Sequence, residues 1–239
     1  MKLLLLNGNT DPAITERLAA AARAMCADEI VPATARFGAR YIATRAASAI
    51  AAHAVLDALA ELVGAENPEG FDAAIIACFG DPGLEAAREM LPIPVLGLAD
   101  ASIVAALRIA PRVALLTGGA AWVPMLREFA LLRGHGPETV RVAAVAPTGD
   151  MIAREPERAL DMLAEAAAQQ VAAGAGVLVL GGAGLVGLAE RLQPQVSVPV
   201  LDCLRVTLDA IREAKPGTTL MQPAPSLGLS HALAQMLAK

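Results

Sequence analysis

Short apolar runs alternate with longer amphipathic stretches along the chain, and this alternation predicts strands separated by helices. In the first half, the expected strands cover residues 2–6, 29–35, 73–77 and 92–97. The expected helices cover residues 13–26, a long segment through His53 and Leu62, and residues 101–107. Buried strands that alternate with helices are typical of parallel sheets with right-handed crossovers, so the predicted fold class is α/β.

The pattern of the first half returns after residue 112. Residues 113–119 match 3–9, and residues 198–202 match 93–97. The apolar run at 177–180 and the glycine-rich turn after it answer the run at 74–77 and the turn that contains Cys78. The repeat predicts two pseudo-symmetric lobes, each a parallel sheet flanked by helices. The first lobe is expected to cover residues 1–100, completed by 206–239, and the second residues 101–205. Ligands of open α/β sheets bind at the carboxyl ends of strands, so the active site is expected in the cleft between the lobes.

Cys78 follows the buried strand at 73–77 and precedes an alanine-rich helix. Asp81 is expected to be the N-cap of that helix, with Pro82 in its first position. The positive end of the helix would favour the thiolate form of the cysteine. The alternative is a buried, inert thiol. On the repeat, Gly182 is the counterpart of Cys78.

Composition narrows the classes of partner. The 239 residues are 56% hydrophobic with a net charge of −5, and they contain no basic patch interleaved with aromatic residues, so nucleic acid is not an expected partner. Three scattered cysteines fit neither a disulfide framework nor a zinc site, which indicates reduced thiols and a cytoplasmic location.

Two apolar segments resemble membrane signals. Residues 3–6 are too short for the core of a signal peptide. Residues 171–189 carry no charge, but six glycines divide them around an expected strand at 177–180. Neither segment is expected to enter a membrane.

Five motifs together resemble the Asp/Glu/hydantoin racemase superfamily, and within it the hydantoin and allantoin racemase branch. They are Asn7-Gly8-Asn9-Thr10, Ala77-Cys78-Phe79-Gly80-Asp81-Pro82-Gly83-Leu84, Leu115-Leu116-Thr117, Leu180-Gly181-Gly182-Ala183-Gly184-Leu185 and Val198-Pro199-Val200-Leu201-Asp202. The resemblance extends to about Ile211. It implies a cofactor-independent enzyme without a metal, built of two α/β lobes that each supply one catalytic cysteine, and a homo-oligomer acting on a small molecule.

The chain departs from this family at important positions. Gly182 stands where the family has its second cysteine, and Gly8 and Gly118 replace residues of the family's polar turns. The resemblance implies Cys78 as acid and base, and Asn9 and Thr117 as substrate contacts. The neighbouring positions expected to line the site are Phe79, Gly80, Gly118 and Ala183.

Several other side chains are candidates for the site. Tyr41 and Arg45 lie one turn apart if their region is helical, where the guanidinium could grip a carboxylate or imide oxygen; a solvated helix face is the alternative. Cys203 and Asp202 follow a strand and could reach the cleft, or could pack in the fold. Cys26 fits a helix core, and His53 fits a partly buried helix position.

Racemisation at a carbon acid normally requires one group to remove a proton and another to deliver one on the opposite face. The first hypothesis is therefore a racemase-type isomerase that uses Cys78 on a hydantoin-like or amino-acid-like substrate, with the opposite thiol missing. The second is a single-cysteine decarboxylase of an arylmalonate-like acid, because loss of CO2 gives the enolate directly. The third is a binding protein without catalysis.

Overall fold

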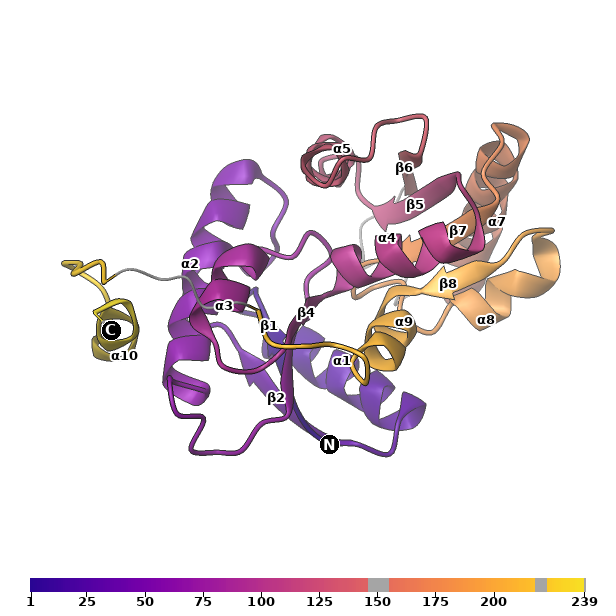
Figure 1. The fold of residues 1–239 in the computed structure, drawn as a ribbon. Coiled ribbons are helices and arrows are strands. Elements are labelled where there is room, and N and C mark those ends of the chain that lie inside the picture. Colours follow the sequence, from indigo (N-terminus) through magenta and orange to yellow (C-terminus); the bar gives the residue numbers. More distant parts are fainter. Residues whose placement is uncertain (146–154, 218–222, 239) are drawn as a thin grey trace. The chain divides into compact units, whose positions relative to one another are not determined.

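The computed structural model describes residues 1–145, 155–217 and 223–238 (Figure 1). These residues form two compact units. The first comprises Met1–Gly97 and Ile211–Lys239, and the second comprises Leu98–Ala210.

The first unit contains a parallel four-stranded sheet in the order β2-β1-β3-β4. Its strands are β1 (Lys2–Asn7), β2 (Glu29–Thr34), β3 (Ala73–Ile76) and β4 (Val95–Gly97). Its helices are α1 (Pro12–Met25), α2 (Arg45–Leu62), α3 (Leu84–Met90) and α10 (His231–Leu237). The four consecutive leucines of β1 are almost completely buried, which is typical of a parallel strand covered by helices on both faces.

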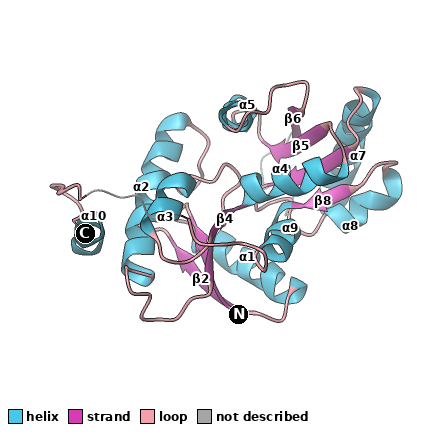
Figure 2. Ribbon diagram, viewed as in Figure 1, coloured by secondary structure: helices cyan, strands magenta, loops and turns pink. Residues whose placement is uncertain are grey.

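Alternate side chains of β1 and β3 build the core on one face of this sheet. Leu4 and Leu6 pack with Val55 and Leu59 of α2, and Leu84 of α3 joins the same cluster. Leu18 and Ala22 of α1 are also fully buried. Figure 2 shows the helices of this unit around its strands.

The second unit repeats this arrangement with the sheet order β6-β5-β7-β8, again entirely parallel. Its strands are β5 (Val113–Gly118), β6 (Val140–Val145), β7 (Val177–Gly181) and β8 (Val200–Asp202). Its helices are α4 (Leu98–Ile109), α5 (Trp122–Leu132), α7 (Pro156–Ala172), α8 (Ala189–Leu192) and α9 (Cys203–Ala210), with a 3-10 turn at Gln193–Gln195. The predicted α/β class, with two parallel sheets flanked by helices, is confirmed.

The uncharged segment at residues 171–189 does not form one continuous helix. It contains the end of α7, strand β7, a glycine-rich turn and the first residue of α8. Within the described ranges, no helix has both the length and the apolar character needed to cross a membrane.

The C-terminal helix α10 packs on α2 through Leu233 and Met236. Beside this contact, Arg36 donates a hydrogen bond to Asp57 of α2 at 2.7 Å. Burial by itself raises the pKa of Asp57, but hydrogen bonds from Arg36 and Ser230 outweigh burial, so the pKa lies below its ordinary value. The ionised carboxylate therefore stabilises the first unit.

We expect Asp57→Asn to lower the free energy of unfolding at pH 7 by about 1–2 kcal/mol, because a charge-assisted hydrogen bond is weakened while the half-exposed Arg36 stays solvated. The folded pKa of Asp57 is depressed, so its stabilisation is present above the unfolded pKa of about 4 and is lost as the pH falls through the folded pKa. Urea unfolding between pH 7 and pH 3 should show the difference between wild type and variant shrinking below pH 4. The exposed Asp161→Asn is the control, and an equal deficit at both ends of this pH range would contradict the assignment.

Candidate functional site

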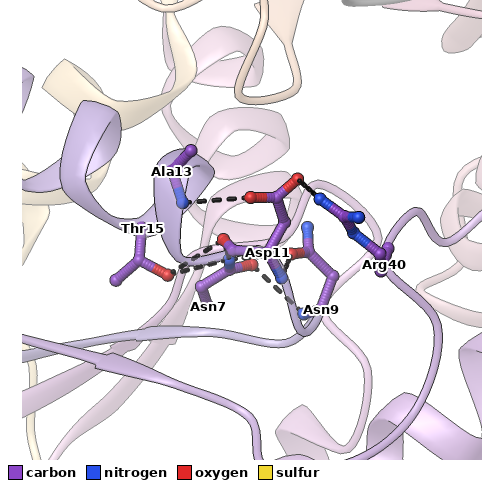
Figure 3. Close-up of polar contacts among 6 residues, drawn as sticks. All are labelled: Asn7, Asn9, Asp11, Ala13, Thr15 and Arg40. Carbon is purple, nitrogen blue, oxygen red and sulfur yellow. Dashed lines mark hydrogen bonds and ion pairs between the residues drawn. The ribbon is translucent and has the colours of Figure 1, made fainter.

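The turn after β1 is held by the buried side chain of Asn7 (Figure 3). Its amide NH2 donates to Asn9 Oδ1 at 2.9 Å, to the Asp11 carbonyl at 3.2 Å and to Thr15 Oγ1 at 3.0 Å. Its Oδ1 accepts from the Asn9 backbone N–H at 3.1 Å. Asn7 thus fixes the path of the chain from the sheet into α1.

These contacts determine the orientation of the Asn9 side chain. Its Oδ1 accepts from the backbone N–H of Asp11 at 2.9 Å as well as from Asn7. A backbone N–H can only donate, so the oxygen must face Asp11 and the NH2 group must point away. The Asn9 NH2 makes no hydrogen bond with the described residues and carries no dashed line in Figure 3, so two oriented donors are available.

The start of α1 supports the same turn. Asp11 is the N-cap, accepting from the Ala13 N–H at 3.0 Å, and Pro12 is the first helical residue. The loop between β2 and α2 lies against this turn, because Thr10 donates to the Ala39 carbonyl at 3.1 Å and Arg40 lies 3.4 Å from the Asp11 carboxylate.

Cys78 lies two residues beyond β3, beside the β1 turn. Ala77 donates to the Leu6 carbonyl at 2.8 Å, which continues the pairing of β1 with β3 up to the cysteine. A Cβ placed on Gly8 would be 3.7 Å from the Cβ of Cys78. The cysteine is partly accessible, so the thiol and the Asn9 turn occupy the carboxyl end of neighbouring strands.

The expectation that a helix N-terminus favours the Cys78 thiolate is wrong. Helix α3 begins at Leu84, its N-cap is Gly83, and Asp81 is a buried turn residue with φ 48° rather than the cap. Burial raises the pKa of the Cys78 thiol, and the negative charge of Asp81 raises it further, to about 12. The thiol is therefore the resting form at neutral pH.

Strand registers identify the equivalent positions of the second unit. Ile76 pairs with Gly97, and Leu180 pairs with Asp202. Counting two residues past Ile76 gives Cys78, and two past Leu180 gives Gly182. The two residues therefore hold the same place in the two sheets.

Gly182 has φ 115°, and a Cβ built there would meet no atom of the described residues within 4 Å. Space for a side chain exists, but the backbone conformation is one that favours glycine. On the neighbouring strand, Thr117 is buried and its hydroxyl makes no hydrogen bond with the described residues. Thr117 and Gly118 are the last two residues of β5. In the first unit, Asn7 is the last residue of β1 and Gly8 is the first residue of the turn after it.

The other residues predicted to contact a substrate have varied environments. Phe79 is buried and Gly80 has φ 137°, while Ala183 is half-buried. Tyr41 is exposed and precedes α2, which begins at Arg45 with Thr44 as its N-cap. The condition for a one-turn spacing of Tyr41 and Arg45, a helix that contains both, is therefore not met.

Other candidates have structural contacts. Asp202 accepts from the N–H groups of Gly187, Leu204 and Arg205, and Cys203 is completely buried in α9. His53 packs edge-to-face on Phe37, and Cys26 caps the end of α1. Among residues 1–145, 155–217 and 223–238, no group of three or more His, Cys, Asp or Glu side chains is arranged to hold a metal ion.

The protein consists of two α/β units whose parallel sheets have the same strand order. In each unit, polar or glycine-rich turns follow the carboxyl ends of the first and third strands along the chain. The sequence profile of the family described as Asp/Glu/Hydantoin racemase matches residues 3–211. The chain belongs to this family.

Relatives are similar over most of the chain. A hydantoin racemase of Paenarthrobacter aurescens is 35% identical over 208 residues, covering 84% of this chain and 86% of the relative. A hydantoin racemase of Pseudomonas sp. (strain NS671) is 31% identical over 206 residues, covering 84% and 81%.

Solved structures share the fold. An allantoin racemase from Klebsiella pneumoniae matches with a TM-score of 0.80 and 28% identity, covering 98% of this chain and 93% of that one. An arylmalonate decarboxylase matches with a TM-score of 0.59 and 17% identity, covering 90% and 96%, which shows a common fold alone.

The two asparagines of the β1 turn should lose different amounts of stability when replaced by aspartate. Asn9→Asp keeps the accepting oxygen, so we expect a loss below about 1 kcal/mol in the free energy of unfolding. Asn7→Asp turns a carboxylate toward three acceptors, and we expect a loss of about 2–4 kcal/mol. Urea unfolding of both variants is the measurement. Equal losses would mean that the Asn9 amide is not oriented as described.

Proposed function

We propose that this protein is a racemase-type isomerase that transfers a proton at the acidic carbon of a small hydantoin-like or amino-acid-like substrate, with Cys78 as the acid and base. The observation that carries the proposal is the juxtaposition of the Cys78 thiol and the oriented Asn9 turn on neighbouring strands. As the family resemblance implies, we propose that the reaction uses no metal or pyridoxal phosphate.

The chemistry requires a proton donor and a site for the enolate oxygen. An enolate is stabilised by preorganised N–H or hydroxyl donors aimed at its oxygen. The Asn9 NH2 supplies such donors from a turn already rigidified by Asn7. Thr117, whose hydroxyl makes no hydrogen bond with the described residues, is a second candidate contact.

The relatives support the choice of substrate class. Two hydantoin racemases match more than four fifths of this chain, with identities of 35% and 31%. A carbon between a carbonyl and a nitrogen, as in a hydantoin, gives up its proton more readily than an ordinary carbon, because the resulting charge is delocalised as an enolate.

Gly182 limits the stereochemistry that we expect. The family resemblance implies one catalytic cysteine from each lobe. In the second unit of this chain, the position that the strand registers make equivalent to Cys78 is occupied by Gly182. Glycine carries no proton, so inversion would depend on water, a poorly matched acid and base for this step. Proton transfer by this protein should therefore favour one face of the substrate.

A second candidate is a decarboxylase of an arylmalonate-like acid, and the protonated state of Cys78 favours it. When CO2 leaves, the electron pair of the broken C–C bond stays on the substrate as an enolate. The Cys78 thiol then gives its proton to the carbon that lost CO2. The resulting thiolate takes a proton from water. Because burial and the Asp81 charge raise the pKa of Cys78 to about 12, the thiol is the stable form at pH 7 and this donor is reloaded after every turnover.

Cys78→Ser should strongly reduce deuterium exchange at the acidic carbon, because a serine hydroxyl is a much weaker acid than a thiol and is not deprotonated to act as a base. Proton NMR in D2O on a panel of hydantoins, allantoin, amino acids and arylmalonates would measure it. We expect a loss of at least about a hundredfold. Cys26→Ser, which changes a cysteine at the end of α1, should keep the wild-type rate.

Two results would contradict this assignment. Wild-type-like exchange in Cys78→Ser would remove the thiol from the reaction. If the folded wild type neither exchanges deuterium nor releases CO2 with any compound of the panel, the result would favour a binding protein without catalysis.

Gly182→Cys should raise inversion of a substrate that the wild type exchanges by about a hundred- to ten-thousand-fold, because it adds an acid and base at the position equivalent to Cys78. The open space at Gly182 accommodates the side chain, although the φ of 115° should cost about 1–3 kcal/mol of stability. Gly182→Ala carries the same strain without a thiol and is the matched control. Chiral chromatography measures inversion, and equal rates in the two folded variants would contradict the two-cysteine ancestry.

A further inference from the structure

We propose that Asp81 is a positioning residue that keeps Cys78 in its protonated thiol form. It does so through its carboxylate, which is fixed within the cysteine loop, residues 78–83. This inference rests on the proposed function of Cys78 as a proton donor, and it assigns a role to a residue that does not itself contact the substrate.

Asp81 places a carboxyl group inside the cysteine loop. The residue sits in a tight turn, where its N–H donates to the Cys78 carbonyl at 3.0 Å and its own carbonyl accepts from Leu84 at 3.2 Å. Its φ of 48° lies in the left-handed region, which aspartate adopts more readily than most residues with a side chain. Only 4% of its surface is exposed, so the carboxyl group is buried in this turn.

The end of β4 fixes the location of that carboxylate. A Cβ built on Gly97 would overlap the carboxyl group of Asp81, so the acid occupies the space in which residue 97 would carry a side chain. Gly97 has no side chain, and this is what lets the carboxylate be buried there. The charge is thereby kept in the cysteine loop instead of turning out to solvent.

The second unit shows that the fold itself does not need an acid in this loop. By the strand registers, Asp81 corresponds to Leu185, which is completely buried, and Gly97 corresponds to Asp202. There the acid lies on the strand and accepts the Gly187 N–H of the loop at 2.6 Å. The unit with the thiol has the acid in the loop, and the unit without the thiol has leucine.

The negative charge of Asp81 acts on the Cys78 thiol. A Cβ built on Gly8 would touch the Cβ of Cys78 and also the side chains of Val55 and Pro82, so the space between the β1 turn and the cysteine is lined by groups that do not ionise. Burial has the largest effect on the pKa of Cys78, and the Asp81 charge adds to it in the same direction. In such surroundings a nearby carboxylate is weakly screened, so its removal should favour the thiolate.

The test is the pH dependence of Cys78 alkylation by iodoacetamide, read by mass spectrometry of the Cys78 peptide between pH 7 and pH 10.5. It uses the whole chain and no substrate. Asp81→Asn keeps the size of the side chain and removes its charge. We expect Cys78 in this variant to label about tenfold faster than in wild type at each pH below 10, because the thiolate fraction rises.

Two controls separate charge from damage to the fold. Asp72→Asn removes an acid at the opposite end of β3 and should leave the profile unchanged. Cys203 is completely buried, so its resistance to labelling reports whether each variant is folded. Asp81→Leu copies the residue of the second unit and should also accelerate labelling, which provides a second variant should Asp81→Asn unfold.

Folded Asp81 variants that label at the wild-type rate, or more slowly, would overturn the inference. Deuterium exchange in the same samples keeps the two proposals apart. Faster labelling without any exchange in wild type would support the role of Asp81 and contradict the proposed function. Exchange that depends on Cys78, with an unchanged labelling profile, would contradict the role of Asp81 alone.

Discussion

The parallel pairing of β1 with β3 is the contact on which the candidate site depends. It brings Leu6 beside Ile76 and continues to the Ala77 N–H, so that the turns after the two strands emerge at the same edge of the sheet. Residues 70 positions apart in the chain, Gly8 and Cys78, become neighbours as a result. The leucines of β1 bury both faces of this strand and so stabilise its position inside the sheet.

The two strands of this pair supply different groups to the site. On the β1 side, Asn7 uses all of its hydrogen-bonding groups within the protein and leaves Asn9 with oriented donors. On the β3 side, burial and a fixed carboxylate keep the thiol neutral. A neutral acid beside oriented donors suits the protonation of an enolate, which is a step of racemisation and of decarboxylation alike. The proposed reaction is centred on one face because the second unit has glycine at the position equivalent to Cys78.

The strands and the repeat could be predicted because their signals are local. Continuous runs of Leu, Ile and Val specify buried parallel strands, and the Val-Pro-Val-Leu echo of the Ile-Pro-Val-Leu segment identifies the matching ends of the two sheets. The helix expected over 13–26 is present, with Asp11 as its N-cap and Pro12 as its first residue.

The same reasoning failed at Asp81-Pro82, because Gly83 takes the N-cap position and the Asp81 side chain packs at Gly97, a contact that no local pattern reveals. The charge state of Cys78 was missed for a related reason. Burial depends on tertiary packing, whereas the expectation had used only the neighbouring helix.

Following deuterium and configuration together in the first turnovers tests the central claim most directly. A single enantiomer of a hydantoin that the protein exchanges would be incubated in D2O. Both enantiomers would then be separated, and the deuterium content of each would be measured by mass spectrometry. A donor on one face predicts that the starting enantiomer gains deuterium faster than its mirror image appears. An unlabelled starting pool, with every inverted molecule carrying deuterium, would require a second acid and base and would contradict the account.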